Sequence, residues 1–416
     1  MKILVLGAGV IGTVTAYCLA RDGHDVTLVD KNPEAGRGAS YSNAGMISPG
    51  DATAWASPGA MKTFVQAFYR SNLGVKVRLP ADPYFYAWSF RFLLQCTTSR
   101  MRASTETLLR LALYSKQCIN EISSETGLSY DERNRGVLYL YRSQRSFDEG
   151  VGNYRFLEDH GLSVEAVDRN RIVDLEPGLA HVRDSLAGGI YSPLDQTGDS
   201  FKFVQGLSAY AVDHLGLKTV FGTSVEKLVV DGDHVRGVST SAGLLSADAI
   251  VLSMGSESGL LGRRIGIDLP VYPVKGYTAT VPLLDISKGP TMGGADEDNL
   301  TAYSRLGNRL RLASTMEFAG FDRGHKAGDF SRLLATGNEL FPGAFDPAQA
   351  ELFSGLRPMM PSSVPLIGRA RYQNLYLNTG HGRTGWTMAC GSGRLLADLV
   401  AGRKTGIDPK GLIYKG

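Results

Sequence analysis

Three glycines and one carboxylate near the start of the chain have the types and spacing of a dinucleotide-binding site. The motif GAGVIG runs from Gly7 to Gly12. In such a motif Gly7 permits a tight turn, Gly9 lets the backbone approach a pyrophosphate, and Gly12 lets a helix pack closely on a sheet. Asp30 is placed to accept hydrogen bonds from a ribose diol. A carboxylate there disfavours the 2′-phosphate of NADP, so the ligand is NAD or FAD.

The surrounding elements are those that this motif requires. Lys2 to Leu6 is a short aliphatic run, typical of a buried parallel strand, and a helix follows that ends near Gly23. Val26 to Val29 supplies a second strand. The helix would offer free N–H groups and its positive dipole end to the diphosphate. The same stretch mimics a signal peptide, but strand, turn, helix and strand account for every residue in it.

The composition excludes several other classes of protein. With 416 residues, 43% apolar and 20% charged, the chain has the profile of a folded soluble protein of two or more structural units. A net charge of +3 without a dense basic run argues against nucleic-acid binding. The cysteines lack metal-ligand spacing, so we expect no metal site and expect them reduced and buried. They are Cys18, Cys96, Cys118 and Cys390.

A loop of small and polar residues, GASYSNAGMISPG, follows the second strand from Gly38 to Gly50. A nicotinamide enzyme usually continues with a helix at this point, whereas this loop is suited to lie against something flat and polar. Its serines and asparagine can form hydrogen bonds, and Ala44 and Gly45 allow close approach.

A second glycine-rich loop, NTGHGRTGWTMACGSG, runs from Asn378 to Gly393 and holds five glycines around one His, one Arg and one Trp. We expect a helix from about Trp386 to Ala401. Its first turn would present free N–H groups and a positive dipole end, which stabilise negative charge on a bound group.

These motifs together resemble a known family. The N-terminal fingerprint, SNAGMISPG, VYPVKGYT, GLRPMMP and NTGHGRTGWTMACGSG occur in the order typical of bacterial D-amino-acid dehydrogenases, within the D-amino-acid oxidase and glycine oxidase superfamily. The resemblance covers Met1 to about Arg403. It implies an α/β fold with non-covalently bound FAD, a Rossmann-like FAD-binding domain, and a discontinuous substrate domain on a large mixed, mostly antiparallel sheet.

The expected domains alternate along the chain. The FAD-binding domain takes residues 1–55, 191–260 and 345–416, and the substrate-binding domain takes 56–190 and 261–344. Periodicity predicts further helices and strands in both. The helices are Thr105–Thr126, Glu149–His160 and Thr197–Leu215, and the strands are Gly136–Tyr141, Lys218–Phe221, a meander ending in Ala249–Ser253, Tyr272–Val281 and Asn308–Ser314.

The resemblance also implies the cofactor contacts. Val225 would lie against the adenine, Gly255 near the phosphates, and His381 beside the flavin ring, with the second glycine-rich loop at the pyrimidine. The full set is Gly7, Gly9, Val10, Ile11, Gly12, Asp30, Lys31, Ala39, Ser40, Ser42, Asn43, Ala44, Gly45, Met46, Val225, Ser253, Gly255, Gly380, His381, Gly382, Gly385, Trp386, Thr387 and Met388.

Five residues are candidates for chemistry on the substrate. A guanidinium can bind both oxygens of a carboxylate in one plane, and the family's carboxylate-binding arginine lies at the motif that holds Arg357. Tyr277 and Tyr303 are weaker candidates for hydrogen bonds to the substrate, because either can equally be packed in a sheet. Lys275 is expected near the flavin or in a structural ion pair, and His381 beside the ring.

The implied reaction is oxidative deamination, a step of amino-acid catabolism. Hydride passes from Cα of a D-amino acid to flavin N5, and the imine hydrolyses to a 2-oxo acid and ammonia. The lone pair of a neutral amine can help to expel the hydride, so no dedicated general base is expected. A D-hydroxyproline or other secondary-amine dehydrogenase and an oxygen-using oxidase stay open as alternatives. So does the role of Arg383, which stands where the family pattern has small or apolar residues.

The electron acceptor is expected to be a quinone or another respiratory carrier. The aromatic segment Asp82 to Cys96, with Arg100 and Arg102 beyond it, is too short to span a bilayer. It is either a core helix of the substrate domain or a peripheral membrane contact. We therefore expect a cytoplasmic protein or one peripheral on the inner face of the cell membrane.

Overall fold

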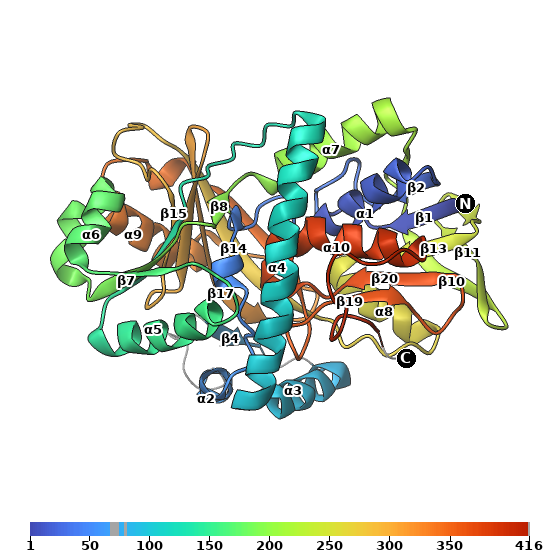
Figure 1. Ribbon diagram of the computed structural model, residues 1–416, viewed down its shortest axis with the longest axis horizontal. Helices are drawn as coiled ribbons and strands as arrows, with labels where there is room; N and C mark the ends of the chain where they lie inside the picture. Colours follow the sequence, from blue (N-terminus) through green and yellow to red (C-terminus); the bar gives the residue numbers. More distant parts are fainter. Residues whose placement is uncertain (67–74, 79–80, 415–416) are drawn as a thin grey trace.

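The computed structural model describes residues 1–66, 75–78 and 81–414 and contains two large sheets (Figure 1). The first has the strand order β19-β20-β13-β1-β2-β9, and all neighbours are parallel except β19 and β20. This is the predicted Rossmann-like sheet. Its strands are β1 (Lys2–Leu6), β2 (Asp25–Val29), β9 (Lys218–Val220), β13 (Ala249–Leu252), β19 (Leu366–Arg369) and β20 (Leu375–Thr379).

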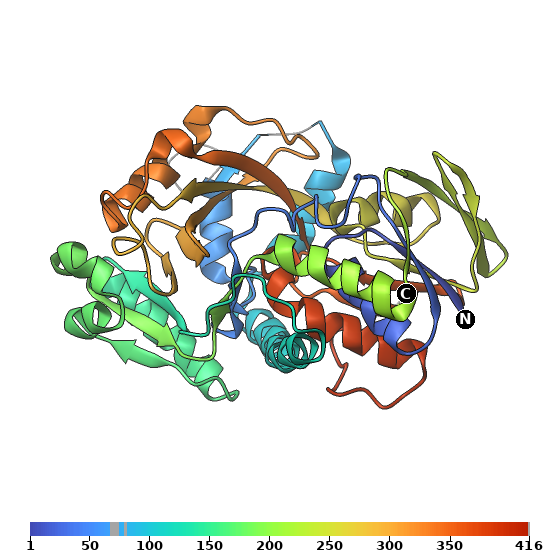
Figure 2. The ribbon, with the colours of Figure 1, turned by 90° about the horizontal axis from the view of Figure 1, so that it is seen from above.

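Alternating side chains of this sheet enter two different cores, because successive residues of a strand face opposite ways. On β1, Ile3 and Val5 pack with the helices of one face, whereas Leu4 and Leu6 pack with a three-stranded meander and α8 on the other. Helices α7, α1, α10 and α4 lie side by side over the first face (Figures 1 and 2). These elements are α1 (Val10–Arg21), α4 (Thr98–Thr126), α7 (Ser200–Leu215), α8 (Ser258–Arg264), α10 (Gly385–Val400), β10 (Val225–Asp231), β11 (His234–Thr240) and β12 (Gly243–Leu245).

The second sheet is mixed and mostly antiparallel, as predicted. Its order is β18-β14-β17-β16-β15-β5-β7-β6, with β4 paired to β17. Only the β15–β5 and β17–β4 pairs of the described strands are parallel in this sheet. The strands are β4 (Val75–Val77), β5 (Val137–Tyr141), β6 (Glu165–Val167), β7 (Gly188–Ser192), β14 (Tyr272–Pro282), β15 (Gly293–Asp296), β16 (Thr301–Leu306), β17 (Arg309–Phe318) and β18 (Glu351–Met359).

Smaller elements complete the fold. A two-stranded ribbon pairs β3 (Met46–Ile47), within the Gly38–Gly50 loop, with β8 (Gln196–Thr197). The other helices are α2 (Pro58–Gln66), α3 (Pro83–Gln95), α5 (Gln144–Glu158), α6 (Arg169–Leu175) and α9 (Ser331–Leu340). Helices α5, α6 and α9 pack on the mixed sheet, at the left of Figure 1. The four cysteines are buried and unpaired, as predicted.

The predicted helices exist, but three begin elsewhere. Helix α4 begins at Thr98 because the Thr97 side chain accepts a hydrogen bond from the Arg100 amide, and α5 begins at Gln144 behind the cap Ser143. Helix α7 begins only after Asp199, which caps its first turn. Apolar periodicity does not register such polar first turns, whereas a side-chain cap fixes where a helix begins.

Helix α3 is apolar on two faces. Phe85, Trp88 and Phe92 are buried in a core with β14, β17 and β18, as predicted for a core helix. On the other face Tyr86 and Phe90 are exposed by 51% and 64%, and Leu94 by 49%. Both predicted readings of this segment therefore have a physical basis. In the part of the chain that the structure describes, no helix is long and apolar enough to cross a bilayer.

Candidate active site

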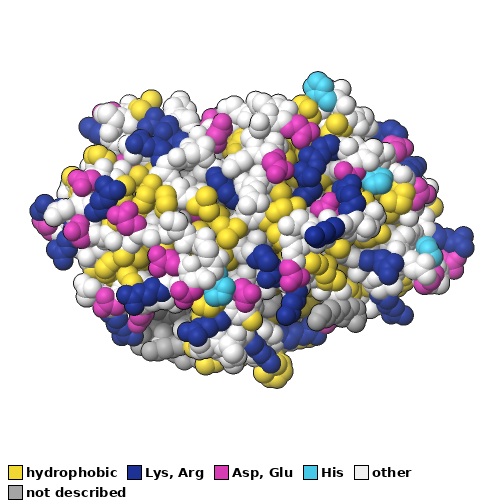
Figure 3. All heavy atoms as spheres, viewed as in Figure 1, with side chains coloured by type: hydrophobic (Ala, Val, Ile, Leu, Met, Phe, Trp, Pro, Cys, Tyr) yellow, Lys and Arg dark blue, Asp and Glu magenta, His cyan; other side chains and the backbone are white. Residues whose placement is uncertain are grey.

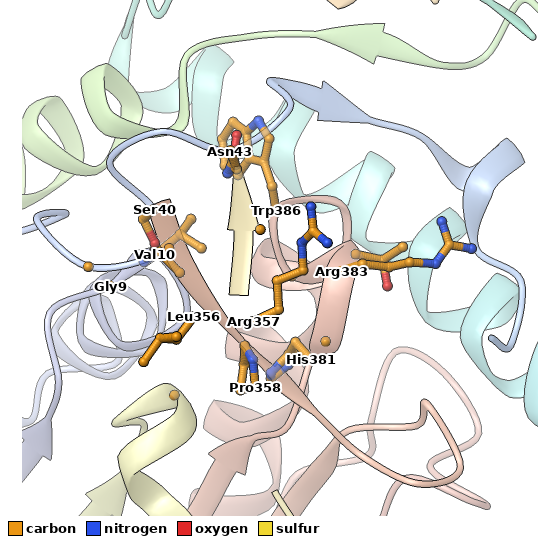
Figure 4. Close-up of a pocket in the computed structure, with 18 of the residues that line it drawn as sticks. Gly9, Val10, Ser40, Asn43, Leu356, Arg357, Pro358, His381, Arg383 and Trp386 are labelled. Atoms are coloured by element: carbon orange, nitrogen blue, oxygen red, sulfur yellow. Dashed lines mark hydrogen bonds between the residues drawn. The ribbon is translucent and has the colours of Figure 1, made fainter. Parts of the chain in front are cut away.

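A continuous cavity of about 390 Å³ runs from the glycine motif after β1 to the mixed sheet. This volume lies within the range of small-molecule sites, about 300–1,000 Å³. Figure 4 shows Gly9, Val10 and Ser40 on one side, Arg383 on the other, and Arg357 and His381 between them. The Gly38–Gly50 loop and the Asn378–Gly393 loop, which are far apart in the sequence, thus line one site.

The three glycines of the N-terminal motif take the predicted conformations. Gly7 has φ +97°, and a Cβ on it would lie 2.5 Å from the Ser253 carbonyl oxygen. A Cβ on Gly12 would lie 1.7 Å from the Gly7 oxygen, so Gly12 serves helix packing and does not line the cavity. A Cβ on Gly9 would meet only Ser40 Oγ at 3.4 Å. The Gly9 backbone is therefore open to a ligand.

The Asp30 carboxylate is fixed at the edge of the cavity. It accepts hydrogen bonds from the Ala8 amide at 2.7 Å, and from the amide and the side chain of Asn32, each at 2.8 Å. An ionised carboxylate offers about four acceptor positions, so one on Oδ2 is left for a ribose hydroxyl. Lys31 lines the same end and forms an ion pair with Glu257.

The Gly38–Gly50 loop joins the two sheets. Ser40 Oγ accepts from the Val10 amide at 2.9 Å, and Ser42 Oγ lies 2.7 Å from Thr278 Oγ1 on β14. Gly45, which was predicted to contact the cofactor, does not line the cavity. Its φ is +69°, and a Cβ on it would face Leu306 and Ser304 instead of the cavity. The loop residues that line the cavity are Gly38, Ala39, Ser40, Ser42, Asn43, Ala44, Met46 and Ser48.

The start of α10 forms another wall. Gly385, Trp386 and Thr387 line the cavity, and the helix has no side-chain cap on its first N–H groups. Met388 was predicted as a contact but is fully buried in the core with α1. Each further residue rotates about 100° around the helix, so Met388, one residue after Thr387, points its side chain into the core.

His381 carries an unsatisfied nitrogen. Its ring is 1% exposed, and Nε2 has no hydrogen-bond partner among the described residues. Burial lowers the pKa of His381 to about 3, so the ring is neutral. Ser253 Oγ, on the same cavity, is also buried without a partner. Unsatisfied buried polar atoms indicate a missing ligand. Together with the open N–H groups and the free position on Asp30, they fit a dinucleotide that carries a polar ring.

Arg357 projects from β18 into the middle of the cavity (Figure 4). Its guanidinium lies against Gly276 of the neighbouring strand β14, where a Cβ would come within 2.6 Å of Cζ. Burial and, to a lesser degree, Arg383 lower the pKa of Arg357 to about 10. The group therefore stays charged at neutral pH.

Three predicted catalytic residues lie outside the cavity. Gly276 and Thr278 of β14 line it, so the alternate residues Lys275 and Tyr277 face the other side of the sheet. Lys275 Nζ binds Asp322 Oδ2 at 3.1 Å and the Gly324 oxygen at 2.8 Å.

Tyr277 donates its hydroxyl hydrogen to Glu317, and the Tyr303 ring packs on Phe341 with centroids 5.0 Å apart. Lys275, Tyr277 and Tyr303 therefore do not line the cavity, and each interacts with other residues instead. Lys275 instead holds the loop that brings Phe321 and Arg323 to the cavity.

The Arg383 side chain does not point only into solvent, because the segment Asp51–Thr53 holds its guanidinium. It pairs with the Asp51 carboxylate and donates to the Asp51 oxygen at 3.1 Å and to Thr53 Oγ1 at 2.9 Å. Asp51, Tyr139 and Glu297 line the same end of the cavity and were not predicted. Asp51 directly follows the Gly38–Gly50 loop, and this position in the sequence could have indicated that it lies at the site. Glu297 follows the short strand β15, which has no periodicity to reveal it.

Comparisons with known proteins show the family of the chain. The sequence model of the FAD dependent oxidoreductase family matches residues 2–399. The chain is 66% identical to D-amino acid dehydrogenase 2 of Mesorhizobium japonicum over 416 residues, with all of both chains covered. It is 42% identical to a D-amino acid dehydrogenase of Bradyrhizobium diazoefficiens, over 99% of this chain and 98% of the relative.

Solved structures share the fold. Glycine oxidase from Geobacillus kaustophilus superposes with a TM-score of 0.75 at 24% identity, covering 100% of this chain and 99% of the other. Iminodiacetate oxidase from Chelativorans sp. BNC1 gives a TM-score of 0.73 at 23% identity, covering 99% and 98%. The cavity, its unsatisfied polar atoms and the full-length family match lead to one conclusion: the chain is an FAD-dependent enzyme that belongs to the FAD dependent oxidoreductase family.

Proposed function

We propose that this enzyme oxidatively deaminates D-amino acids to 2-oxo acids and ammonia and passes the electrons to a quinone or another respiratory acceptor. The observation that carries the proposal is the Arg357 guanidinium, which faces the same cavity as both cofactor loops. The names of relatives that match the full chain at 66% and 42% identity support the substrate class.

The residues of the chain have distinct tasks in this proposal. Arg357 binds the substrate carboxylate in two places, and so fixes the direction of Cα. Neutral His381 and the first turn of α10 provide donors and a positive dipole end beside the ring. Bound FAD supplies the hydride acceptor. The walls of the cavity exclude water until the imine leaves, and the imine then hydrolyses in solution.

We propose the following division of labour along the chain. Residues 1–55, 191–260 and 345–416 bind the cofactor, and residues 56–190 and 261–344 form the substrate side. The six-stranded sheet supports the first group, because most of its cavity-lining loops follow β1, β2, β13 and β20. In open α/β sheets ligands bind beyond the carboxyl ends of the strands.

A substrate panel tests the proposal. The holoenzyme is assayed with D- and L-amino acids and secondary amines against an artificial dye, with peroxide measured in parallel. We expect dye reduction with D-amino acids and little peroxide. Turnover of D-hydroxyproline or another secondary amine alone, or stoichiometric peroxide, would replace the proposal by one of the alternatives.

We further propose that the exposed face of α3 contacts a lipid bilayer, where a quinone would be found. Tyr86, Phe90 and Leu94 recur every four residues on one face, and Arg100 and Arg102 are exposed just beyond them. An apolar stripe beside basic residues is typical of interfacial helices on anionic membranes. On the face drawn in Figure 3, side chains of both charges are interspersed.

Flotation with anionic vesicles tests the contact. We expect the protein to float at low salt and the double variant Phe90→Ser/Leu94→Ser to stay in solution. Leu244→Ser is the matched control, because Leu244 is 67% exposed on β12, in the three-stranded meander and not on α3. A wild-type protein that fails to float at low salt would rule the contact out.

A further inference from the structure

Glu297 is an acidic residue of the cavity that has no partner. It directly follows β15, and its backbone is fixed by a hydrogen bond from its amide to the Leu140 oxygen at 2.9 Å. Glu297 lines the cavity, and its carboxylate makes no hydrogen bond or ion pair among the described residues. The neighbouring Asp296, in contrast, pairs with Arg142 at 2.7 Å and accepts two hydrogen bonds from Asn299.

The charges around Glu297 leave one negative charge uncompensated. Arg383, the cation on the cavity wall that acts electrostatically on Glu297, is already paired with Asp51 and held by Thr53. Burial and Asp51 raise the pKa of Glu297 to about 7, and Arg383 opposes this rise. A partly buried carboxylate without a partner takes up a proton more readily, and a ligand cation beside it would favour the charged form. A second substrate carboxylate, on the other hand, would find Arg383 occupied and Glu297 repulsive.

Glu297 lies far from Arg357 along the sheet. Arg357 is on β18 and Glu297 follows β15, four strands away in the order β18-β14-β17-β16-β15. With neighbouring strands about 4.8 Å apart, these two strands are separated by about 19 Å. Both residues line the cavity and have long side chains, which reduces the gap that a ligand between them has to span. A substrate held by its carboxylate at Arg357 can therefore reach Glu297 only with a long side chain.

We propose that Glu297 is a specificity-determining residue that selects D-amino acids with a long side chain ending in a cation, such as lysine, ornithine or arginine. This inference rests on the proposed function, because it assumes that Arg357 holds the substrate carboxylate. The charged side chain of the substrate would supply the missing cation. The Arg383–Asp51 pair would line the cavity between Arg357 and Glu297. A hydrogen bond between charged groups of this kind contributes about ten- to a hundredfold in affinity.

Kinetics with matched substrates test the assignment. D-Norleucine has the four-carbon chain of D-lysine without the terminal amine. We expect wild-type enzyme to prefer D-lysine in kcat/KM, and Glu297→Gln to lower kcat/KM for D-lysine by about ten- to a hundredfold while changing D-norleucine by less than about threefold. Glu149→Gln, the same charge change on an exposed residue of α5, is the control and should leave both values unchanged.

Binding without turnover gives a second readout. Titrations followed by flavin absorbance compare 6-aminohexanoate with hexanoate, which differ only in the terminal amine. Wild type should bind the amine more tightly, and Glu297→Gln should lose the difference. A wild type that prefers D-norleucine, or a variant that lowers both substrates equally, would overturn the assignment. If no D-amino acid reduces the flavin of the wild type, the proposed function fails instead.

Discussion

A substitution at Gly276 can displace the guanidinium of Arg357, the proposed binding group for the substrate carboxylate, without changing Arg357 itself. An alanine Cβ at this position would lie 2.6 Å from Cζ and Nη2 of Arg357 and 2.8 Å from Nε. Non-bonded atoms in contact stay about 3.5–4.0 Å apart, so in Gly276→Ala the guanidinium has to retreat by about 1 Å. The end of a flexible arginine can do so, and we expect the fold to survive.

The displacement should appear in substrate binding. A misplacement of about 1 Å in an active site can cost up to about a hundredfold, and hydrogen bonds between charged groups contribute about 1.5–3 kcal/mol. We therefore expect the KM for D-amino acids to rise about ten- to a hundredfold in Gly276→Ala, with a smaller change in kcat. Both parameters are measured with a dye acceptor, and the FAD content is measured by absorbance.

The matched control is Gly152→Ala on α5, where a Cβ meets no atom within 4 Å. It should leave KM and FAD content unchanged. A Gly276→Ala enzyme with wild-type KM would refute the reasoning that Arg357, held against β14, anchors the substrate. Loss of FAD from this variant would instead show that the strand supports the cofactor.

Four further outcomes follow from the site. Arg357→Ala should raise KM sharply and retain FAD, and unchanged kinetics would remove Arg357 from the site. Gly12→Ala should abolish FAD binding, because its Cβ would lie 1.7 Å from the Gly7 oxygen; full FAD occupancy in purified protein would contradict this. Arg383→Ala should lower the free energy of unfolding by about 1–2 kcal/mol in denaturant titration, because the charged hydrogen bonds to Asp51 and Thr53 are lost and partial exposure weakens them. Glu297 has a raised pKa of about 7 and loses its charge as pH falls through that value, so the preference for D-lysine over D-norleucine should weaken from about pH 8 to about pH 6. A flat ratio over this range would argue against a charged Glu297.

Local rules made the cofactor half of the site predictable. Gly7, Gly9 and Gly12 each answer a backbone demand that depends only on neighbouring elements, and the structure meets all three. The start of α10 followed in the same way from a glycine-rich loop that runs into a helix. Met388 failed because one residue of error along a helix turns a side chain from the cavity into the core.

The substrate half depends on strand pairing over long distances. Lys275 and Tyr277 lie in a motif that resembles the family, but the face of β14 that meets the cavity is set by its pairing with β17 and β18. Asp51, Glu297 and Arg383 come from three separate segments, and only the folded chain places them together. Single-sequence patterns do not encode such convergence.

Anaerobic reduction of the purified holoenzyme by paired enantiomers is the most direct test of the proposal that the enzyme oxidises D-amino acids whose carboxylate binds Arg357. We expect D-amino acids to bleach the flavin absorbance while their L-enantiomers do not, and Arg357→Ala to need far higher substrate concentrations for the same bleaching. Bleaching by L-enantiomers alone, or none with any amino acid in enzyme that retains FAD, would contradict it.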